Sequence, residues 1–161
     1  MTSTRSLAGA AIAVGLILGT GNTALAFDGG SRTTSTTSSA PRDADYGAAE
    51  EAFKAGKYAA AIPLLEKVVA RDPKNADAWN RLGFSNRKLG KYPAALADYE
   101  KALSINPDHL GANEYLGELY LETGDMPKAE ERLAKLDQLC TFGCEEYRAL
   151  KAAIAAKKKA S

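Results

Sequence analysis

The chain has 161 residues, a length that suits one domain with additional terminal segments. Only 7% of the residues are aromatic, and alanine is abundant, a composition that favours closely packed helices over a sheet. The formal net charge is +1, so no strong field of either sign attracts nucleic acid or an anionic membrane, and nucleic acid is not an expected partner.

Residues 1–26 have the features of a secretory signal peptide. Arg5 is their only charged residue, and an apolar run of small and aliphatic residues extends from Leu7 to Leu18. That run is shorter than the roughly 20 residues that a membrane-spanning helix needs. Ala24-Leu25-Ala26 supplies the A-x-A pattern of a cleavage site. We predict cleavage after Ala26 and no stable membrane insertion afterwards; an uncleaved membrane anchor is the alternative.

Residues 27–41 are rich in Ser, Thr and Gly and contain few apolar side chains. Such a segment cannot bury enough apolar surface to offset the entropy that ordering it would cost. We interpret it as a flexible leader between the cleavage site and the folded domain.

A period of 34 residues begins near residue 42. Each 34-residue unit reads as two helices in succession. The period relates the glycine that follows the first helix of each unit, Gly56, Gly90 and Gly124, and an alanine within the second helix, Ala61, Ala95 and Ala129. A glycine can take the positive φ that satisfies the last carbonyls of a helix, and an alanine lets two helices approach closely. Three units in phase without an insertion therefore predict three helical hairpins, each of which needs its neighbours to bury its apolar face.

The unit 76–109 carries the most complete motif. It contains W-x-x-L-G from Trp79, A-x-x-x-Y-x-x-A-L from Ala95, and a closing Pro107. This pattern resembles the tetratricopeptide repeat, whose period is 34 residues. The resemblance implies an all-α, right-handed α-solenoid of three helix–turn–helix repeats, 42–75, 76–109 and 110–143. The first repeat departs from the motif, as terminal repeats commonly do.

Residues 144–161 follow the third repeat and are predicted to form a capping helix with a basic tail. Tyr147, Leu150 and Ile154 fall on one side of a helical pattern from Glu145 to Ala156, which opens with acidic residues and is followed by lysines. This charge order suits the helix dipole. At the preceding junction between repeats, Asp108 is the expected N-cap of the helix that begins near Leu110, and His109 is interpreted as a surface or capping residue.

The resemblance also implies a concave surface lined by the first helix of each repeat. The positions that match are Tyr46, Glu50, Phe53 and Lys54 in the first repeat, Asn80, Phe84, Arg87 and Lys88 in the second, and Glu114, Glu118, Leu121 and Glu122 in the third. We expect a groove that is basic in its middle and acidic at its C-terminal end, with Phe53 and Phe84 as apolar anchors. An extended or helical peptide of the opposite charge order would fit it.

One subset of the family holds the C-terminal carboxylate of chaperone peptides with basic and amide side chains. The matching positions here are Tyr46, Glu50, Arg81, Gly111 and Tyr115, of which only Arg81 is basic. This carboxylate clamp is therefore not expected.

Cys140 and Cys144 are the only cysteines, and an oxidising compartment favours a disulfide between them. Closing so small a loop would stabilise the fold by roughly 2 kcal/mol; two free thiols or intermolecular bridges are the alternatives. The C-x-x-x-C spacing does not complete a four-ligand metal site, and it differs from the C-x-x-C of a redox motif. No metal, cofactor or catalytic residue is predicted, because nothing in the sequence pairs a nucleophile with a base.

The sequence thus predicts a non-enzymatic protein-interaction module that binds a peptide segment of another protein in its concave groove. Because an export signal precedes the repeats, we expect a bacterial protein that is periplasmic or secreted. Two alternatives stay open: a self-assembling structural factor that forms homo-oligomers, and a thiol- or metal-handling protein that uses Cys140 and Cys144.

Overall fold

The computed structural model describes residues 43–160, so the predicted signal peptide, the leader and residue 42 lie outside the described residues. Within this range the chain forms seven helices and no strand, which confirms the all-α prediction. The helices are α1 (Ala44–Lys54), α2 (Tyr58–Arg71), α3 (Ala76–Lys88), α4 (Tyr92–Ile105), α5 (Leu110–Thr123), α6 (Met126–Leu139) and α7 (Glu145–Ala160). None of these helices combines the length and the apolar character that crossing a membrane requires.

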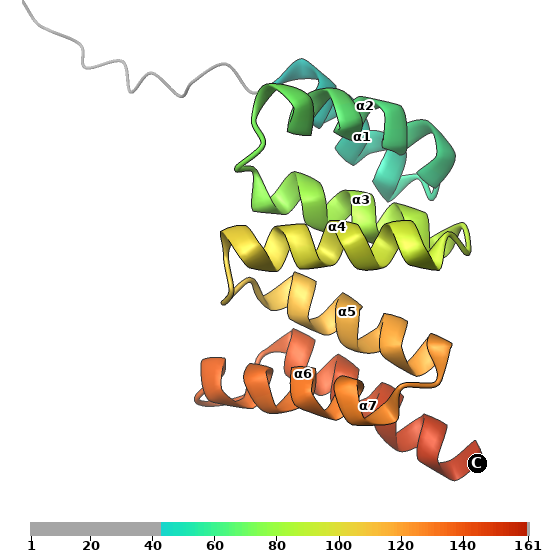
Figure 1. The fold of residues 1–161 in the computed structure, drawn as a ribbon, viewed down its shortest axis with the longest axis vertical. Helices are drawn as coiled ribbons and strands as arrows, with labels where there is room; N and C mark the ends of the chain where they lie inside the picture. The colour runs from blue at the N-terminus through green and yellow to red at the C-terminus, as the bar shows by residue number, and fades with distance from the viewer. Residues whose placement is uncertain (1–42, 161) are drawn as a thin grey trace, which may run out of the picture. The chain divides into compact units, whose positions relative to one another are not determined.

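The first six helices form three hairpins that follow one another in chain order (Figure 1). The pairs are α1 with α2, α3 with α4, and α5 with α6, and each second helix of the first two pairs also packs against the first helix of the next pair. The last helix, α7, packs against both α5 and α6. The three predicted repeats and the capping helix are therefore a helical solenoid.

The turn inside each hairpin depends on the glycine that recurs every 34 residues. Gly90, with φ of 73°, closely follows α3, and Gly56 and Gly124 occupy the equivalent places with φ of 70° and 86°. Other residues rarely adopt this left-handed conformation without strain. The backbone N–H of Gly90 donates to the carbonyl of Arg87 at 2.9 Å, which ends the helix as the spacing predicts.

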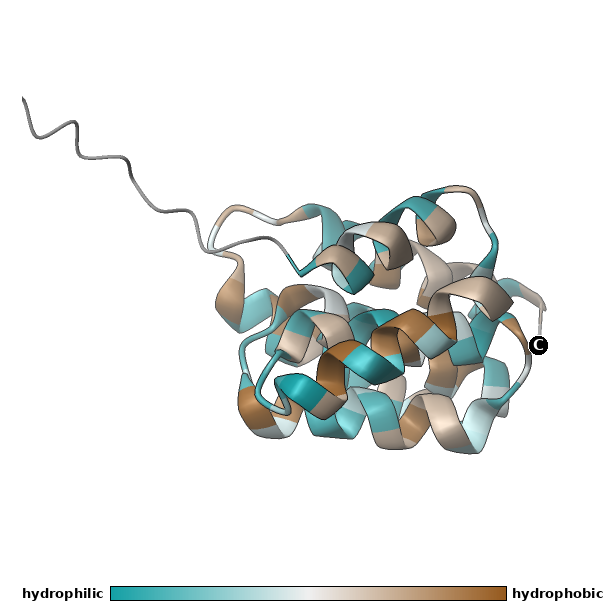
Figure 2. Ribbon diagram, turned by 90° about the horizontal axis from the view of Figure 1, so that it is seen from above, coloured by the Kyte–Doolittle hydropathy of each residue, from teal (hydrophilic) through white to brown (hydrophobic). Residues whose placement is uncertain are grey.

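The interior combines alanines at recurring positions with larger aliphatic side chains and Tyr99. Ala61, Ala95 and Ala129, one from each second helix, are all 0% exposed, as is Tyr99. Hydrophilic and hydrophobic residues alternate around the individual helices, so each helix has an apolar side for its neighbours (Figure 2). The small side chains at these recurring positions therefore allow the helices to pack closely.

The cap is joined to the last repeat by a short turn. Cys140 and Cys144 form a disulfide across this turn, with their Cα atoms 5.5 Å apart. Leu150 and Ile154 of α7 are 0% and 5% exposed and belong to the same apolar cluster as Leu136 of α6. The helix extends to Ala160, beyond its expected end at Ala156.

One predicted helix cap is wrong. His109, not Asp108, is the N-cap of α5: its Nδ1 accepts a hydrogen bond from the backbone N–H of Ala112 at 3.2 Å. The Asp108 carboxylate instead lies 2.7 Å from Nζ of Lys135. The backbone of His109 is extended, as an N-cap requires, so its side chain is the one placed over the first turn.

Candidate functional site

The first helices of the three hairpins lie next to one another, because α1 contacts α3 and α3 contacts α5. Their shared face carries a row of three aromatic rings, Phe53, Phe84 and Tyr115, one from each helix. The ring centroids are 4.8 Å apart both between Phe53 and Phe84 and between Phe84 and Tyr115. All three side chains are partly exposed, so the row forms an apolar strip along the face. We call this strip the aromatic row.

Arg87 lies beside the row and is held by two carboxylates of the next repeat. Its Nη2 is 2.6 Å from Oε2 of Glu118, and its Nη1 is 2.5 Å from Oε1 of Glu122. The Arg87 side chain is only 2% exposed. Glu118 and Glu122, from the expected acidic end of the groove, therefore neutralise Arg87 in its expected basic middle, and little of the Arg87 charge faces a ligand.

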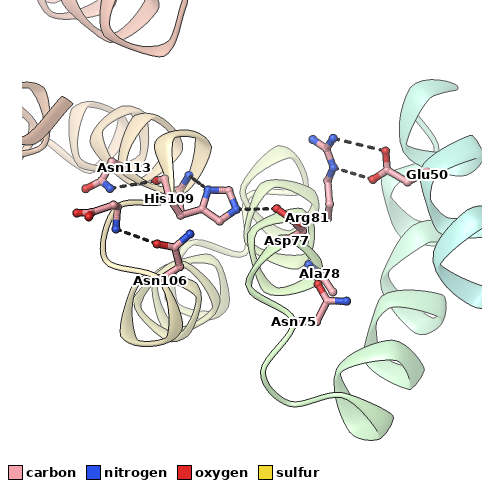
Figure 3. Close-up of polar contacts among 10 residues, drawn as sticks. Glu50, Asn75, Asp77, Ala78, Arg81, Asn106, His109 and Asn113 are labelled. Atoms are coloured by element: carbon pink, nitrogen blue, oxygen red, sulfur yellow. Dashed lines mark hydrogen bonds and ion pairs between the residues drawn. The ribbon is translucent and has the colours of Figure 1, made fainter. Parts of the chain in front are cut away.

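A second ion pair links the first two repeats. Nε of Arg81 lies 2.7 Å from Oε1 of Glu50, and Figure 3 draws this ion pair as dashed lines. Cζ of Arg81 lies 4.3 Å from the centre of the Phe53 ring. Burial opposes the charge of Arg81, but the hydrogen bond to Glu50 gives this arginine a pKa above its ordinary value. The pair thus fixes one end of the aromatic row.

The remaining predicted groove residues divide by exposure. Lys54 and Lys88 are exposed, and Nζ of Lys88 lies 5.1 Å from the centre of the Phe84 ring. Asn80 and Leu121, by contrast, are 5% and 7% exposed, because neighbouring helices cover them. The sequence pattern placed these two on the surface because it identifies the helix face but not how closely the next helix covers it.

Two cavities flank the aromatic row on this face. The first has a volume of about 470 Å³ and lies between α3, α5 and α7; its lining residues are Arg87, Lys88, Glu118, Leu121, Glu122, Ala153, Ala156 and Lys157. The second has a volume of about 380 Å³ and is formed near the N-terminal ends of α1, α3, α5 and α7. Its lining residues are Tyr46, Asp77, Asn80, Arg81, His109, Gly111, Glu114, Tyr115 and Glu146. We call the second one the acidic cavity.

A hydrogen bond from His109 connects α5 to α3 at the edge of the acidic cavity. Nε2 of His109 lies 3.0 Å from Oδ1 of Asp77, while Nδ1 accepts the backbone N–H that caps α5 (Figure 3). Since Nδ1 must keep its lone pair to accept, the hydrogen is on Nε2, which donates to Asp77.

Glu114 lines the same cavity in a region of negative potential. Its pKa is raised to about 7, first by burial and then by the nearby carboxylates of Glu118, Glu146 and Glu145. Arg87 opposes this shift only weakly. The carboxyl group is therefore one whose charge a bound cation would stabilise.

The acidic cavity contains residues that the sequence analysis did not assign to a site, namely Asp77, Arg81, His109, Gly111, Tyr115 and Glu146. Asp77 and His109 are 32 residues apart, and Glu50 and Arg81 are 31 apart. Partners separated by about one repeat could have been found by pairing opposite polar groups at that spacing. Glu146 belongs to the cap, outside the period, and carried no such signal.

In the part of the chain that the structure describes, no three His, Cys, Asp or Glu side chains gather in an arrangement that would hold a metal ion. The two cysteines are both in the disulfide.

Family models describe two overlapping parts of the chain. Residues 76–109 and residues 52–84 each match a model of the tetratricopeptide repeat. None of the curated protein sequences compared with this chain matches it.

Several solved structures share the fold. The type III secretion chaperone SycD of Yersinia enterocolitica, in complex with a peptide of the translocator YopD, is 20% identical, with a TM-score of 0.62 over 72% of this chain and 88% of that one. PcrH in complex with the chaperone binding region of PopD is 23% identical, with a TM-score of 0.61 over 72% and 86%. MamA is 24% identical, with a TM-score of 0.62 over 71% and 67%.

Proposed function

We propose that this chain, a tetratricopeptide-repeat protein, binds an extended or helical segment of another protein along the face formed by α1, α3, α5 and α7. Two of its structural neighbours, SycD and PcrH, were solved with peptides or binding regions of their partners. The chain acts as a protein-interaction module that performs no catalysis.

The aromatic row is the observation that carries this proposal. Phe53, Phe84 and Tyr115 present a continuous strip of ring surface, while the adjacent arginine is occupied by Glu118 and Glu122. Partly exposed aromatic side chains in a groove provide anchoring area at a small entropic cost, because their rings are already held by packing. Apolar side chains of the partner are therefore expected to lie on the row, with polar contacts at its two ends.

A peptide-display selection against the full chain tests the proposal. Enriched peptides are titrated against the wild type and against a groove variant, Lys54→Glu/Lys88→Glu, which reverses two exposed charges, one on α1 and one on α3 beside the Phe84 ring. The matched control is Lys67→Glu/Lys101→Glu, which makes the same change on the exposed sides of α2 and α4. Because Arg87 is buried, it is left intact.

Groove binding is supported if the peptides bind the groove variant with lower affinity than the wild type and bind the control variant with the same affinity as the wild type. Equal binding to both variants, or a loss confined to the control, overturns it. Circular dichroism of both variants checks that the helices are retained.

Self-association is the second candidate, and exposed apolar side chains favour it. Phe142 is 99% exposed in the disulfide turn, and Leu89 and Tyr92, 40% and 37% exposed, flank the turn between α3 and α4. SycD, which shares the fold, has been solved in an alternative dimer. Analytical ultracentrifugation at increasing protein concentration measures self-association. A molecular mass that rises with concentration in the wild type, but not in a Phe142→Ser variant, supports assembly. A monomer mass at every concentration excludes it.

We further propose that the chain is exported to the periplasm or secreted after cleavage following Ala26. The apolar run from Leu7 to Leu18, the A-x-A pattern and the Cys140–Cys144 disulfide support this location. Fractionation of a bacterial host that expresses the full gene, with mass spectrometry of the product, tests it. A periplasmic chain that begins at Phe27 is the expected result; an intact N-terminus in the cytoplasm overturns the proposal.

A further inference from the structure

The acidic cavity carries more negative charge than the residues around it balance. Three carboxylates line it: Asp77 from α3, Glu114 from α5 and Glu146 from α7. The only arginine in its lining, Arg81, is bound to Glu50 and stacked on Phe53, and no lysine is among the described residues that line it. A cationic group in the cavity would therefore be attracted by the net negative charge of its lining.

Asn80 supplies a second and independent indication of a ligand. Its side chain lines the cavity and is 5% exposed, yet its Oδ1 has no hydrogen-bond partner among the described residues. A buried carbonyl-type oxygen without a donor costs free energy, and such groups are uncommon unless something else occupies the site. The missing partner is a hydrogen-bond donor.

The walls of the cavity suit a cationic side chain better than a bare ion. Tyr46 and Tyr115 contribute aromatic rings from α1 and α5, and rings attract ammonium and guanidinium groups. Gly111 carries no side chain that would narrow the cavity beside Asn80 and Tyr115: a Cβ there would lie 3.2 Å from Nδ2 of Asn80 and 3.8 Å from Cε2 of Tyr115. Space, rings and acceptors thus coincide at one place.

From these observations we propose that the acidic cavity binds the side chain of a lysine or arginine in the protein segment that occupies the groove. The ammonium or guanidinium group donates to Asn80 Oδ1 and to the Glu114 and Asp77 carboxylates, while its methylene stem lies against the tyrosine rings. The inference rests on the proposed function, because the rest of the segment would bind to the aromatic row, next to the cavity.

Nuclear magnetic resonance with small probes tests the cavity by itself. N-acetyl-lysine methylamide is titrated into the ¹⁵N-labelled full chain, and N-acetyl-norleucine methylamide, which lacks the charge, is the matched probe. We expect saturable shifts of the backbone amides of Asp77, Gly111 and Glu114 with the lysine probe and none with norleucine. Absent shifts, or equal shifts with both probes, overturn the proposal.

Variants identify the carboxylate that is responsible. Glu114→Gln is expected to lower the affinity for the lysine probe about three- to fivefold, which is the effect expected from the loss of a partly exposed ion pair. Glu100→Gln, on the exposed side of α4, removes the same charge elsewhere and leaves the affinity unchanged. An unchanged affinity in Glu114→Gln overturns the assignment, and circular dichroism confirms that the variant is folded.

Peptides from the display selection separate this inference from the proposed function. If they depend on the groove but show no preference for lysine or arginine at any position, and bind Glu114→Gln like the wild type, groove binding stands and the basic-side-chain site fails. If they carry a basic residue at one position, and that preference disappears in a selection against Glu114→Gln, the cavity is its receptor.

Discussion

The ring of Tyr99 in α4 lies directly against the backbone of Gly83 in α3. A Cβ added at Gly83 would be 2.6 Å from both Cδ1 and Cε1 of Tyr99, closer than such atoms approach in proteins. Tyr99 is 0% exposed and cannot move aside without disturbing the core. The two helices of the central repeat can therefore pack this closely only because residue 83 has no side chain.

Gly83→Ala is expected to destabilise the fold by about 1–2 kcal/mol, because the overpacking exceeds the helix propensity that alanine gains. Urea unfolding followed by circular dichroism measures the change. Gly47→Ala in α1 is the matched control, since nothing lies within 4 Å of the added Cβ, and it should gain up to about 1 kcal/mol. A neutral or stabilising Gly83→Ala would show that Tyr99 is not packed as described.

Arg87→Met is expected to lower the free energy of unfolding by about 2 kcal/mol, because it leaves Glu118 and Glu122 next to each other without their cation. In the double variant Arg87→Met/Glu118→Gln the loss should be less than the sum of the single losses, since the two residues form one network. Additive losses would contradict direct pairing. Lys88→Met, at the exposed neighbouring position, should change stability by no more than about 0.5 kcal/mol.

Reduction of the Cys140–Cys144 disulfide is expected to cost about 2 kcal/mol or less, since the closed loop contains few residues. Leu150→Ala should cost more, about 2–5 kcal/mol, because Leu150 is 0% exposed and fills the space above Gly117. Unfolding with and without a reductant, beside the Leu150→Ala variant, gives the comparison. A larger loss from reduction than from Leu150→Ala would show that the disulfide, rather than packing, holds the cap.

Glu114→Gln should stabilise the fold at pH 8 and have no effect at pH 4. The pKa of Glu114 is about 7 in the folded chain against an ordinary value of 4.5, so the folded state disfavours its charge. That penalty is absent at a pH below the ordinary pKa, grows as the pH rises toward the folded-state pKa, and is constant above it. The gain at pH 8 should be of the order of 1 kcal/mol after allowance for solvent screening.

Thermal unfolding of wild type and variant across this pH range measures the effect, with Glu100→Gln as the control for loss of a carboxylate as such. A gain that is the same at pH 4 and pH 8 would contradict a raised pKa of Glu114.

The fold followed from the sequence because its determinants are local and periodic. Gly56, Gly90 and Gly124 mark the turns, and Ala61, Ala95 and Ala129 mark the close contacts at the same spacing. Each hairpin is a short-range structure whose residues all lie within one 34-residue unit. Repetition of the unit then places each hairpin against the next.

The cap of α5 could not be assigned in this way. Asp108 and His109 are adjacent, both carry acceptor atoms, and propensity favours aspartate. The choice depends on which of the two is extended above the first turn, and on Lys135 and Asp77, which approach from other helices.

Local sequence was enough to define the helices, the turns and the face on which Phe53, Phe84 and the charged residues lie. The stacking of the repeats, which no local pattern describes, buries Arg87 between Glu118 and Glu122 and gathers four polar side chains around one cavity, namely Asp77, Asn80, Glu114 and Glu146. The reason is physical: helical periodicity sets the direction of a side chain, whereas burial and ion pairing depend on the distance to helices that lie one or more repeats away. Charges that look available along a helix can therefore be neutralised once the repeats are stacked.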